Sequence, residues 1–406
     1  MSSTLALPTW PEIEGNGLAL LGRLTAISSP SGDAAAVRRM ADALGSELTA
    51  RGMAIEIRDE SDARGQAQPL LVARSSPSGR SPLLLLGHLD TVLPAAAARR
   101  DGDRVYATGA NDMKGGFAAF LLALDLLRQG GREMPDDLEL VAVPDEETGG
   151  AITERITRRR GAAAREVWVL EPGEMRGDAE TIVGGRRGLF HWHFTAHGRS
   201  AHSGLHFWHG RSALLAAAEF ARAAADLSRE GRGPTVNPAR LVAGSSELLA
   251  RLGEPAAGDL LGSPRQVNVV PDEAGLDGEA RFLRGEEAEP LRRRLLELSG
   301  EIGRRHEVGT ELTLGEVVPP FDPGGPQRAL GEQAVGLAAR RGWSLAVETE
   351  RGGISFPNFL ESPGRMPVID GLGPVGGGMH TREEHVSLRS LARRGALIAD
   401  LLVERG

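Results

Sequence analysis

Histidine and carboxylate side chains stand directly after apolar segments in the first half of this sequence. They are His88 and Asp90 after LLLLG, Asp145, Glu146 and Glu147 after LELVAVP, and Glu171 after EVWVL. If the segments are parallel strands, their carboxyl ends meet at one edge of a sheet, where open α/β sheets bind ligands. The chain contains no cysteine, so a metal held here would have histidine and carboxylate ligands, which suit zinc, manganese or cobalt.

Two further residues extend this set. Asp112 precedes a long apolar segment in NDMKGGFAAFLL, and His380 follows the glycine-rich GPVGGGM. So many carboxylates at one edge would repel one another without cations, and two dications about 3.5–4 Å apart recur in aminopeptidases and related hydrolases. Glu146 and Glu147 are neighbours and point in different directions, so one can bind a metal while the other acts as a base on metal-bound water.

The spacing of the first pair also has a structural meaning. His88 and Asp90 are two residues apart on an extended strand end, so their side chains point the same way. We therefore expect the Asp90 carboxylate to accept the second ring N–H of His88, as carboxylates behind metal-bound histidines do. Each motif alone has a commoner explanation: a helix N-cap for Asp112, or a solvated acidic loop for the DEE sequence. Their joint occurrence at element ends favours a metal centre.

The elements that position these residues are strands alternating with helices. Apolar strands are predicted from about 83, 138 and 166, and KGGFAAFLLALDLLRQGG (114–131) predicts a buried helix. Two helices are expected in 10–50, with a turn near Ser28–Asp33. This order is typical of an α/β protein with a mostly parallel central sheet flanked by helices.

The pattern changes after Gly184. LFHWHFTA alternates between aromatic residues and histidines, and helices are predicted at about 211–229 and 286–306. With strands near 266–270, 275–283 and 309–317, the order β-α-β-β-α-β predicts a ferredoxin-like α+β domain. We place this inserted lid domain at 187–317, between catalytic segments 1–186 and 318–406. Residues 228–264 are expected to be loop with one short helix.

Seven motifs stand in a recognisable order: GHLDTV, GANDMKGG, PDEE, LEP, GRSAHSG, NVVP and GGGMH. In these motifs the sequence resembles the dinuclear-zinc exopeptidases and deacylases, which include bacterial glutamate carboxypeptidase, aminoacylase, acetylornithine deacetylase and succinyl-diaminopimelate desuccinylase. The likeness runs from about residue 15 to the end and is strongest to bacterial glutamate carboxypeptidase. It implies two zinc ions per subunit, bridged by Asp112. His88 and Glu171 would complete one metal site, and Glu147 and His380 the other.

The resemblance also assigns residues around the metals. The peptide bond after Asp112 would be cis, and the lid would form a homodimer contact. The other assignments are Glu146 as general base, Asp90 as partner of His88, His202 reaching the active site of the partner subunit, and Asn268, Arg281, Gly377 and Gly378 as substrate contacts, Arg281 through a carboxylate.

Three segments depart from the family pattern. Phe356 stands where the family has an aspartate, aromatic residues and histidines follow His202, and about twenty residues near 245–264 are inserted. Six of the ten histidines lie between His191 and His209. We favour an exposed face or subunit contact for these over a third metal site.

The expected activity is zinc-dependent hydrolysis of an amide bond in an N-acyl amino acid or short peptide with a free carboxylate. An amidohydrolase of narrow biosynthetic or detoxifying specificity is the alternative enzyme, and a non-catalytic binding protein that retains the fold is the alternative class. The net charge of −8 and scattered basic residues argue against nucleic acid. Without a recognisable signal peptide or apolar run of about 20 residues, we expect a cytoplasmic protein that does not bind membranes.

Overall fold

The computed structural model describes residues 5–247, 249, 267–360 and 366–406. The chain divides into two compact units. Met1–Arg186 and Phe321–Gly406 form the larger unit, and Arg187–Pro320 form the inserted unit. The insertion predicted from the sequence, 187–317, begins at the same residue and ends three residues earlier.

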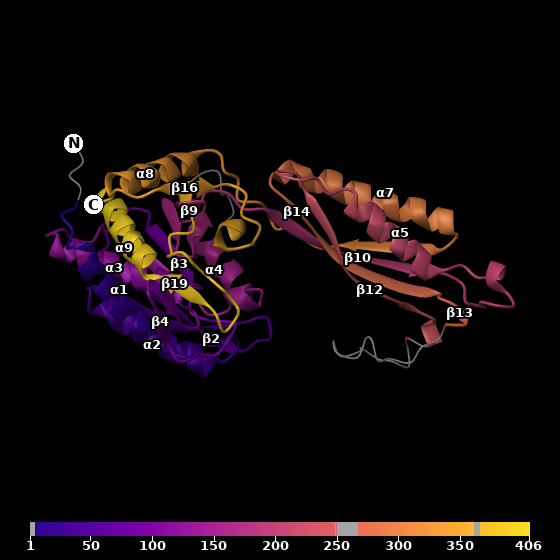
Figure 1. The fold of residues 1–406 in the computed structure, drawn as a ribbon, viewed down its shortest axis with the longest axis horizontal. Helices are drawn as coiled ribbons and strands as arrows, with labels where there is room; N and C mark the ends of the chain where they lie inside the picture. Colours follow the sequence, from indigo (N-terminus) through magenta and orange to yellow (C-terminus); the bar gives the residue numbers. More distant parts are fainter. Residues whose placement is uncertain (1–4, 248, 250–266, 361–365) are drawn as a thin grey trace. The chain divides into compact units, whose positions relative to one another are not determined.

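The larger unit is built on a six-stranded sheet with the order β1-β2-β6-β3-β7-β17; strands β2 and β3 are labelled in Figure 1. The last four strands run parallel, and the β1–β2 hairpin adds antiparallel strands at one side. Their bounds are β1 Ala54–Ser61, β2 Ala67–Arg74, β6 Leu138–Val143, β3 Leu83–His88, β7 Glu166–Val169 and β17 Val368–Ile369. The predicted, mostly parallel α/β sheet is confirmed.

Helices cover both faces of this sheet. Leu83 and Leu85 of β3 pack with helices α1, α2, α3 and α9, whereas Leu84 and Leu86 pack on the side of α4. All four leucines are fully buried, which is why this strand shows no polar alternation. The helices are α1 Trp10–Thr25, α2 Ala34–Thr49, α3 Lys114–Gln129, α4 Ala151–Gly161, α8 Pro326–Arg340 and α9 Leu388–Val403.

Two smaller sheets complete the larger unit. Their strands are β16 Leu345–Glu348, β9 Ala179–Val183 and β8 Met175–Arg176 in one, and β18 Gly376–Gly377, β19 His385–Ser387, β5 Arg104–Tyr106 and β4 Arg99–Asp101 in the other. The second sheet joins the segment before α3 to the segment before α9, because β19 pairs with β5.

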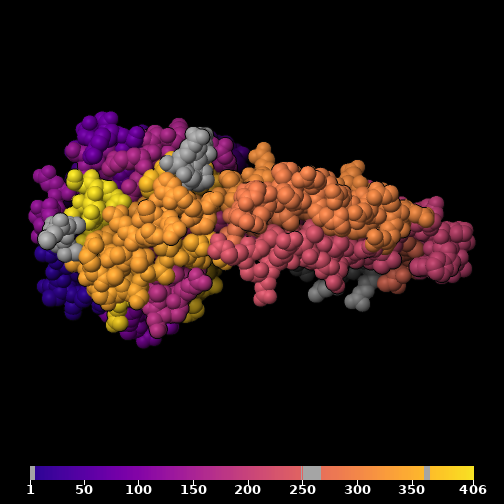
Figure 2. All heavy atoms as spheres, turned by 90° about the horizontal axis from the view of Figure 1, so that it is seen from above, coloured from indigo at the N-terminus to yellow at the C-terminus, as the bar shows by residue number. Residues whose placement is uncertain are grey.

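The inserted unit is a four-stranded antiparallel sheet with two helices on one face (Figure 1), and Figure 2 views it from the helix side. The order is β12-β14-β10-β15, with β12 Thr235–Gly244, β14 Glu273–Phe282, β10 Gly188–His197, β15 Gly309–Leu314, α5 Ala213–Ala225 and α7 Ala288–His306. Phe190, Trp192 and Phe194 of β10 are buried, and Phe194 stacks on Phe220 of α5 at 4.1 Å between ring centroids. The histidines between them face away from the helices, as the alternation predicts.

One prediction for this unit is wrong. Within 228–264, where loop and a short helix were expected, the structure contains the ten-residue strand β12. It lies at the sheet edge, its register shifts between Pro238 and Arg240, and much of it is exposed, so no apolar alternation marks it. The strand predicted at 266–270 is reduced to β13 (Val269–Val270), which pairs with β11 (Ala201–His202) outside the main sheet. Residues 250–264, which hold most of the inserted segment, lie outside the described residues.

Candidate metal centre

Two groups of candidate ligands share one carboxylate. His88, Asp112 and Glu171 form one group, and Asp112, Glu147 and His380 form the other, with one ligand atom per residue within 4.8 Å of the others in its group. Asp112 directs Oδ1 to within 3.0 Å of His88 Nε2 and Oδ2 to within 3.4 Å of His380 Nε2. A carboxylate with one oxygen in each group has the geometry of a bridging ligand.

The parallel strands and their loops place these side chains. His88 ends β3, Glu171 follows β7 by two residues, and Glu147 lies in the short 3-10 turn Glu146–Thr148 after β6. Asp112 precedes α3, and the peptide bond between Asp112 and Met113 is cis, as the resemblance implied. His380 follows β18 in a left-handed conformation with φ of 64°. The carboxyl edge of the sheet therefore gathers ligands from segments far apart in sequence.

The acids of the centre repel one another. Burial, followed by the charge of Asp112, raises the pKa of Glu146 to about 7 and of Glu147 to about 8, and the same causes raise the pKa of Glu171 well above its usual range. The hydrogen bond to Asp112 raises the pKa of His380 to about 9. In the metal-free protein, protons on the histidines and carboxylates of the centre thus balance the negative charge of its acids. A pair of dications would balance it instead, so the donor set fits the metals expected from the sequence.

Asp90 contacts the turn that carries Glu146 and Glu147 as well as the ring of His88. Its carboxylate accepts the backbone N–H groups of Glu146 and Glu147 at 3.3 Å each and the hydroxyl of Ser31 at 2.8 Å. The ring Nδ1 of His88 lies 2.9 Å from the backbone carbonyl of Asp90 but 3.5 Å from its carboxylate. The carbonyl is thus the nearer acceptor, where the spacing argument expected the carboxylate. Either acceptor would put the ring proton on Nδ1 and leave Nε2 to face Asp112.

Comparison with known proteins identifies the family to which this fold and centre belong. Residues 84–404 match the model of peptidase family M20/M25/M40. The chain belongs to this family. Carboxypeptidase G2 from Pseudomonas sp. (strain RS-16) is 25% identical over 95% of this chain and 88% of its own length. Succinyl-diaminopimelate desuccinylase from Verminephrobacter eiseniae is 28% identical, with coverage of 86% and 87%.

Solved structures agree on the fold. Aminopeptidase PepT from Bacillus cereus superposes with a TM-score of 0.78 at 20% identity, covering 97% of this chain and 98% of its own. A tripeptidase from Staphylococcus aureus gives 0.77 at 21% identity, with coverage of 96% and 99%. The recognition from sequence motifs is confirmed, and the M20 chain is a metallohydrolase of amide or peptide bonds.

The predicted residues of the inserted unit are exposed or half-buried. His202 accepts the backbone N–H groups of Gly204 and Leu205 on Nδ1, at 3.1 and 3.3 Å, so its neutral ring carries the proton on Nε2. Asn268 is exposed. Arg281 is half-buried, and both carboxylate oxygens of Glu279 accept from its guanidinium, at 2.8 and 3.0 Å. A substrate carboxylate would have to compete with Glu279, and the substrate-binding role of Arg281 stays a prediction.

The remaining predictions concern glycines and the histidine cluster. Gly377 ends β18, and Gly378 has φ of 70° in the turn before His380; their contact with substrate stays a prediction. On the face of the inserted sheet that points away from its helices, His193 and His197 pair with Asp277 and Glu273 at 2.7 and 2.8 Å. Within the described part of the chain, the two groups of candidate ligands include none of the six clustered histidines.

Three buried residues near the centre were not singled out from the sequence. Lys114, the single lysine of the chain, donates to the carbonyl of Ile27 at 2.6 Å, and burial lowers its pKa to about 8. Arg186 pairs with Asp370 at 2.5 Å. Glu384 binds the loop that carries Asp112. Lys114 could have been singled out from the sequence because it is the single lysine of the chain, whereas nothing in the sequence distinguishes Arg186 or Glu384.

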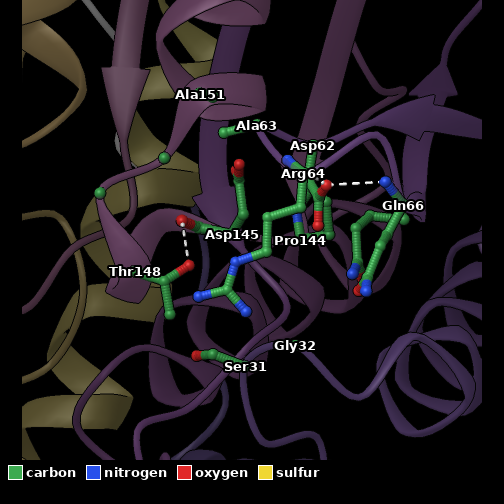
Figure 3. A pocket seen from close by; sticks show the side chains of 13 residues that line it. Ser31, Gly32, Asp62, Ala63, Arg64, Gln66, Pro144, Asp145, Thr148 and Ala151 are labelled. Carbon is green, nitrogen blue, oxygen red and sulfur yellow. Dashed lines mark hydrogen bonds between the residues drawn. The ribbon is translucent and has the colours of Figure 1, made fainter.

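A polar hollow of about 370 Å³ lies between the turn after β1 and the loop before α4 (Figure 3). Its two acids are bound internally. Asp62 accepts the backbone N–H groups of Arg64 and Gln66 at 2.8 Å each. Asp145 accepts two N–H groups at the start of α4 and the hydroxyl of Thr153. Asp145 is therefore a helix cap, and the first acid of the DEE sequence does not join the candidate ligands.

Proposed function

We propose that this M20 protein is a hydrolase with two zinc ions per subunit that cleaves an amide bond in an N-acyl amino acid or short peptide with a free carboxylate. The observation that carries the proposal is Asp112, which offers one oxygen to each of two candidate ligand groups. His88 and Glu171 would complete the first metal site, and Glu147 and His380 the second. Cobalt or manganese would suit the same ligands. The relatives' names, a carboxypeptidase and a desuccinylase, support the substrate class.

Glu146 is the general base of this proposal. When bound, two dications lower the pKa of a water and polarise the substrate carbonyl. Glu146 would accept the proton of that water and then pass it to the leaving amine. Glu146 precedes the candidate ligand Glu147 in the same short turn, and a general base placed beside metal-bound water typically contributes about 10²–10⁴-fold to turnover.

His202 and Arg281 would bind the substrate. The Nε2–H group of His202 can donate a hydrogen bond to the oxyanion that forms during attack, because Nδ1 accepts two backbone N–H groups and so leaves the ring proton on Nε2. Arg281 presents a planar fork that matches a carboxylate. Asn268, Gly377 and Gly378 are proposed as further substrate contacts from the family resemblance.

We further propose a homodimer through the inserted unit, with His202 acting in the partner subunit's active site. The ten-residue edge strand β12 supports this proposal, because proteins usually cover or pair long sheet edges. A twofold contact between two copies would do so. No helix within the described residues is long and apolar enough to cross a membrane, and a cytoplasmic location remains our expectation.

The test compares metal content with turnover. The chelator-treated protein should be inactive, and zinc should restore hydrolysis of N-acyl amino acids or dipeptides more than of their C-terminal amides. Activity confined to one acyl group would favour the narrow amidohydrolase. A purified protein that holds almost no metal and binds acyl amino acids without cleaving them would contradict the proposal and favour a binding protein.

A further inference from the structure

The carboxylate of Glu384 receives three backbone N–H groups of the loop that carries Asp112. Its Oε2 accepts from Gly109 at 2.8 Å, and its Oε1 accepts from Asn111 at 2.9 Å and from Asp112 at 3.0 Å. Glu384 is 4% exposed. Backbone N–H groups that converge in this way form an anion-binding nest, and here the anion is a side chain of the protein itself.

The main chain of the same residue secures the other end of that loop and the turn that carries His380. The carbonyl of Glu384 accepts the N–H of Ala107 at 3.2 Å, and its own N–H donates to the carbonyl of Thr381 at 3.3 Å. Thr381 in turn donates to Gly378 at 3.1 Å. Glu384 thus connects residues 107–112 with the turn 378–384, the segments that carry Asp112 and His380.

The second ligand group depends on this connection. Asp112 and His380 lie 3.4 Å apart at their nearest polar atoms, and Glu147 lies 3.1 Å from His380. His380 is half exposed, with 53% of its side chain accessible, so packing holds it weakly. Its position relative to Asp112 is set mainly by the turn that Glu384 ties down.

We propose that Glu384 is a positioning residue that fixes Asp112 relative to His380 and so sets the affinity of the metal site that they form with Glu147. This inference rests on the proposed two-metal function. The first group shares Asp112, but its other two ligands lie at the end of strand β3 (His88) and two residues after strand β7 (Glu171), and neither is carried by the turn that holds His380. Loss of Glu384 should therefore weaken one metal site much more than the other.

Glu384→Gln tests the proposal with little change of shape. The glutamine oxygen can accept from one side of the nest, but its NH₂ group faces an N–H donor on the other. Glu383→Gln is the matched control, because Glu383 is the adjacent residue, has 72% of its side chain exposed and pairs with Arg99 at the surface. Both variants remove one negative charge, but only one alters the nest.

The measurement is release of each zinc ion from the loaded protein into excess chelator, together with thermal unfolding of the metal-free protein. In Glu384→Gln we expect one of two ions to leave about 10–100-fold faster, the range typical of residues that orient metal ligands, and the other at the unaltered rate. Glu383→Gln should match the unmodified protein. Turnover by Glu384→Gln should recover at high zinc concentration, as a defect in positioning predicts.

Some outcomes would overturn the proposal. A folded Glu384→Gln variant that releases both ions at the unaltered rates, even with a lower melting temperature, would show a structural role only. Equal acceleration of both ions would also refute selective positioning. If Glu384→Gln does not fold, Glu384→Asp keeps the charge but shortens the reach, and the same selective release is expected from it. An unmodified protein that binds no zinc would instead contradict the proposed function itself.

Discussion

Removing the metals should make the stability of this protein fall as the pH rises. Glu146 and Glu147 have pKa values raised by burial and then by the charge of Asp112, to about 7 and about 8. Between the unfolded value near 4.5 and these folded values, the native chain keeps protons that the unfolded chain has lost, so unfolding becomes easier with increasing pH. The raised pKa values of His88 and His380 act in the same direction.

The size of the effect follows from the shifts. Each pKa unit corresponds to about 1.4 kcal/mol, but Glu146 and Glu147 share the same repulsion and cannot be counted separately in full. We therefore expect a loss of roughly 3–5 kcal/mol between about pH 5 and about pH 8.5. For a unit of this size, that is a fall in melting temperature of roughly 10 °C. Bound dications hold the carboxylates ionised and should remove most of the slope.

Calorimetry of chelator-treated and zinc-loaded protein at several pH values would measure both slopes. The double variant Glu146→Gln with Glu147→Gln is the control, because its metal-free form should lose the part of the pH dependence that these two acids contribute, whereas Glu171, His88 and His380 keep theirs. If the metal-free protein kept a constant melting temperature through this range, or if zinc left its slope unchanged, the assignment of repulsion to these two acids would be wrong.

Three further predictions concern catalysis. Glu146→Gln should keep both metals but lose about 10²–10⁴-fold in turnover; near-normal turnover of the metal-replete variant would refute its role as base. Arg281→Ala should reduce kcat/KM far more for carboxylate substrates than for their amides. Glu279→Gln should raise kcat/KM for carboxylate substrates, because it removes the acid that pairs with Arg281. If Arg281→Ala lowers kcat/KM equally for both kinds of substrate, Arg281 is structural. Inactive His202→Ala and Glu146→Gln proteins should regain activity when their subunits exchange. Persistent inactivity despite proven exchange would exclude action in the partner subunit.

The sequence predicts the buried elements best. The run Leu83–Leu86 reads as a strand covered on both sides, and the structure buries it on both sides. The hairpin of β1 and β2 was not predicted, because the exposed and half-buried residues of β1 form no clear apolar pattern. Strand β12 was missed for a related reason: an exposed edge strand with a proline has the composition of a loop.

The candidate centre was visible because its ligands follow recognisable elements. The residues that hold these ligands in place, such as Glu384, were not visible, because they bind backbone atoms that are distant in sequence. Glu384 binds amides 272 to 275 residues away, and no residue type or spacing announces such a contact. The same limit applies to His88. The acceptor nearest to its ring Nδ1 is the backbone carbonyl of Asp90, whereas the spacing suggested the carboxylate of Asp90.

The acids of Asp145-Glu146-Glu147 show how local backbone geometry divides adjacent, chemically similar residues. Asp145 turns back to cap α4 and is held by two amides and a hydroxyl. The short turn that follows directs Glu147 to within 3.1 Å of His380, while Asp90 grips the backbone N–H groups of both glutamates. Asp90 and Glu384 thus make the same kind of contact, each through a carboxylate that accepts backbone N–H groups of a ligand-bearing loop. Because both bind the main chain, exchanging a ligand side chain would leave these supports in place, whereas losing a support would displace ligands that are themselves intact.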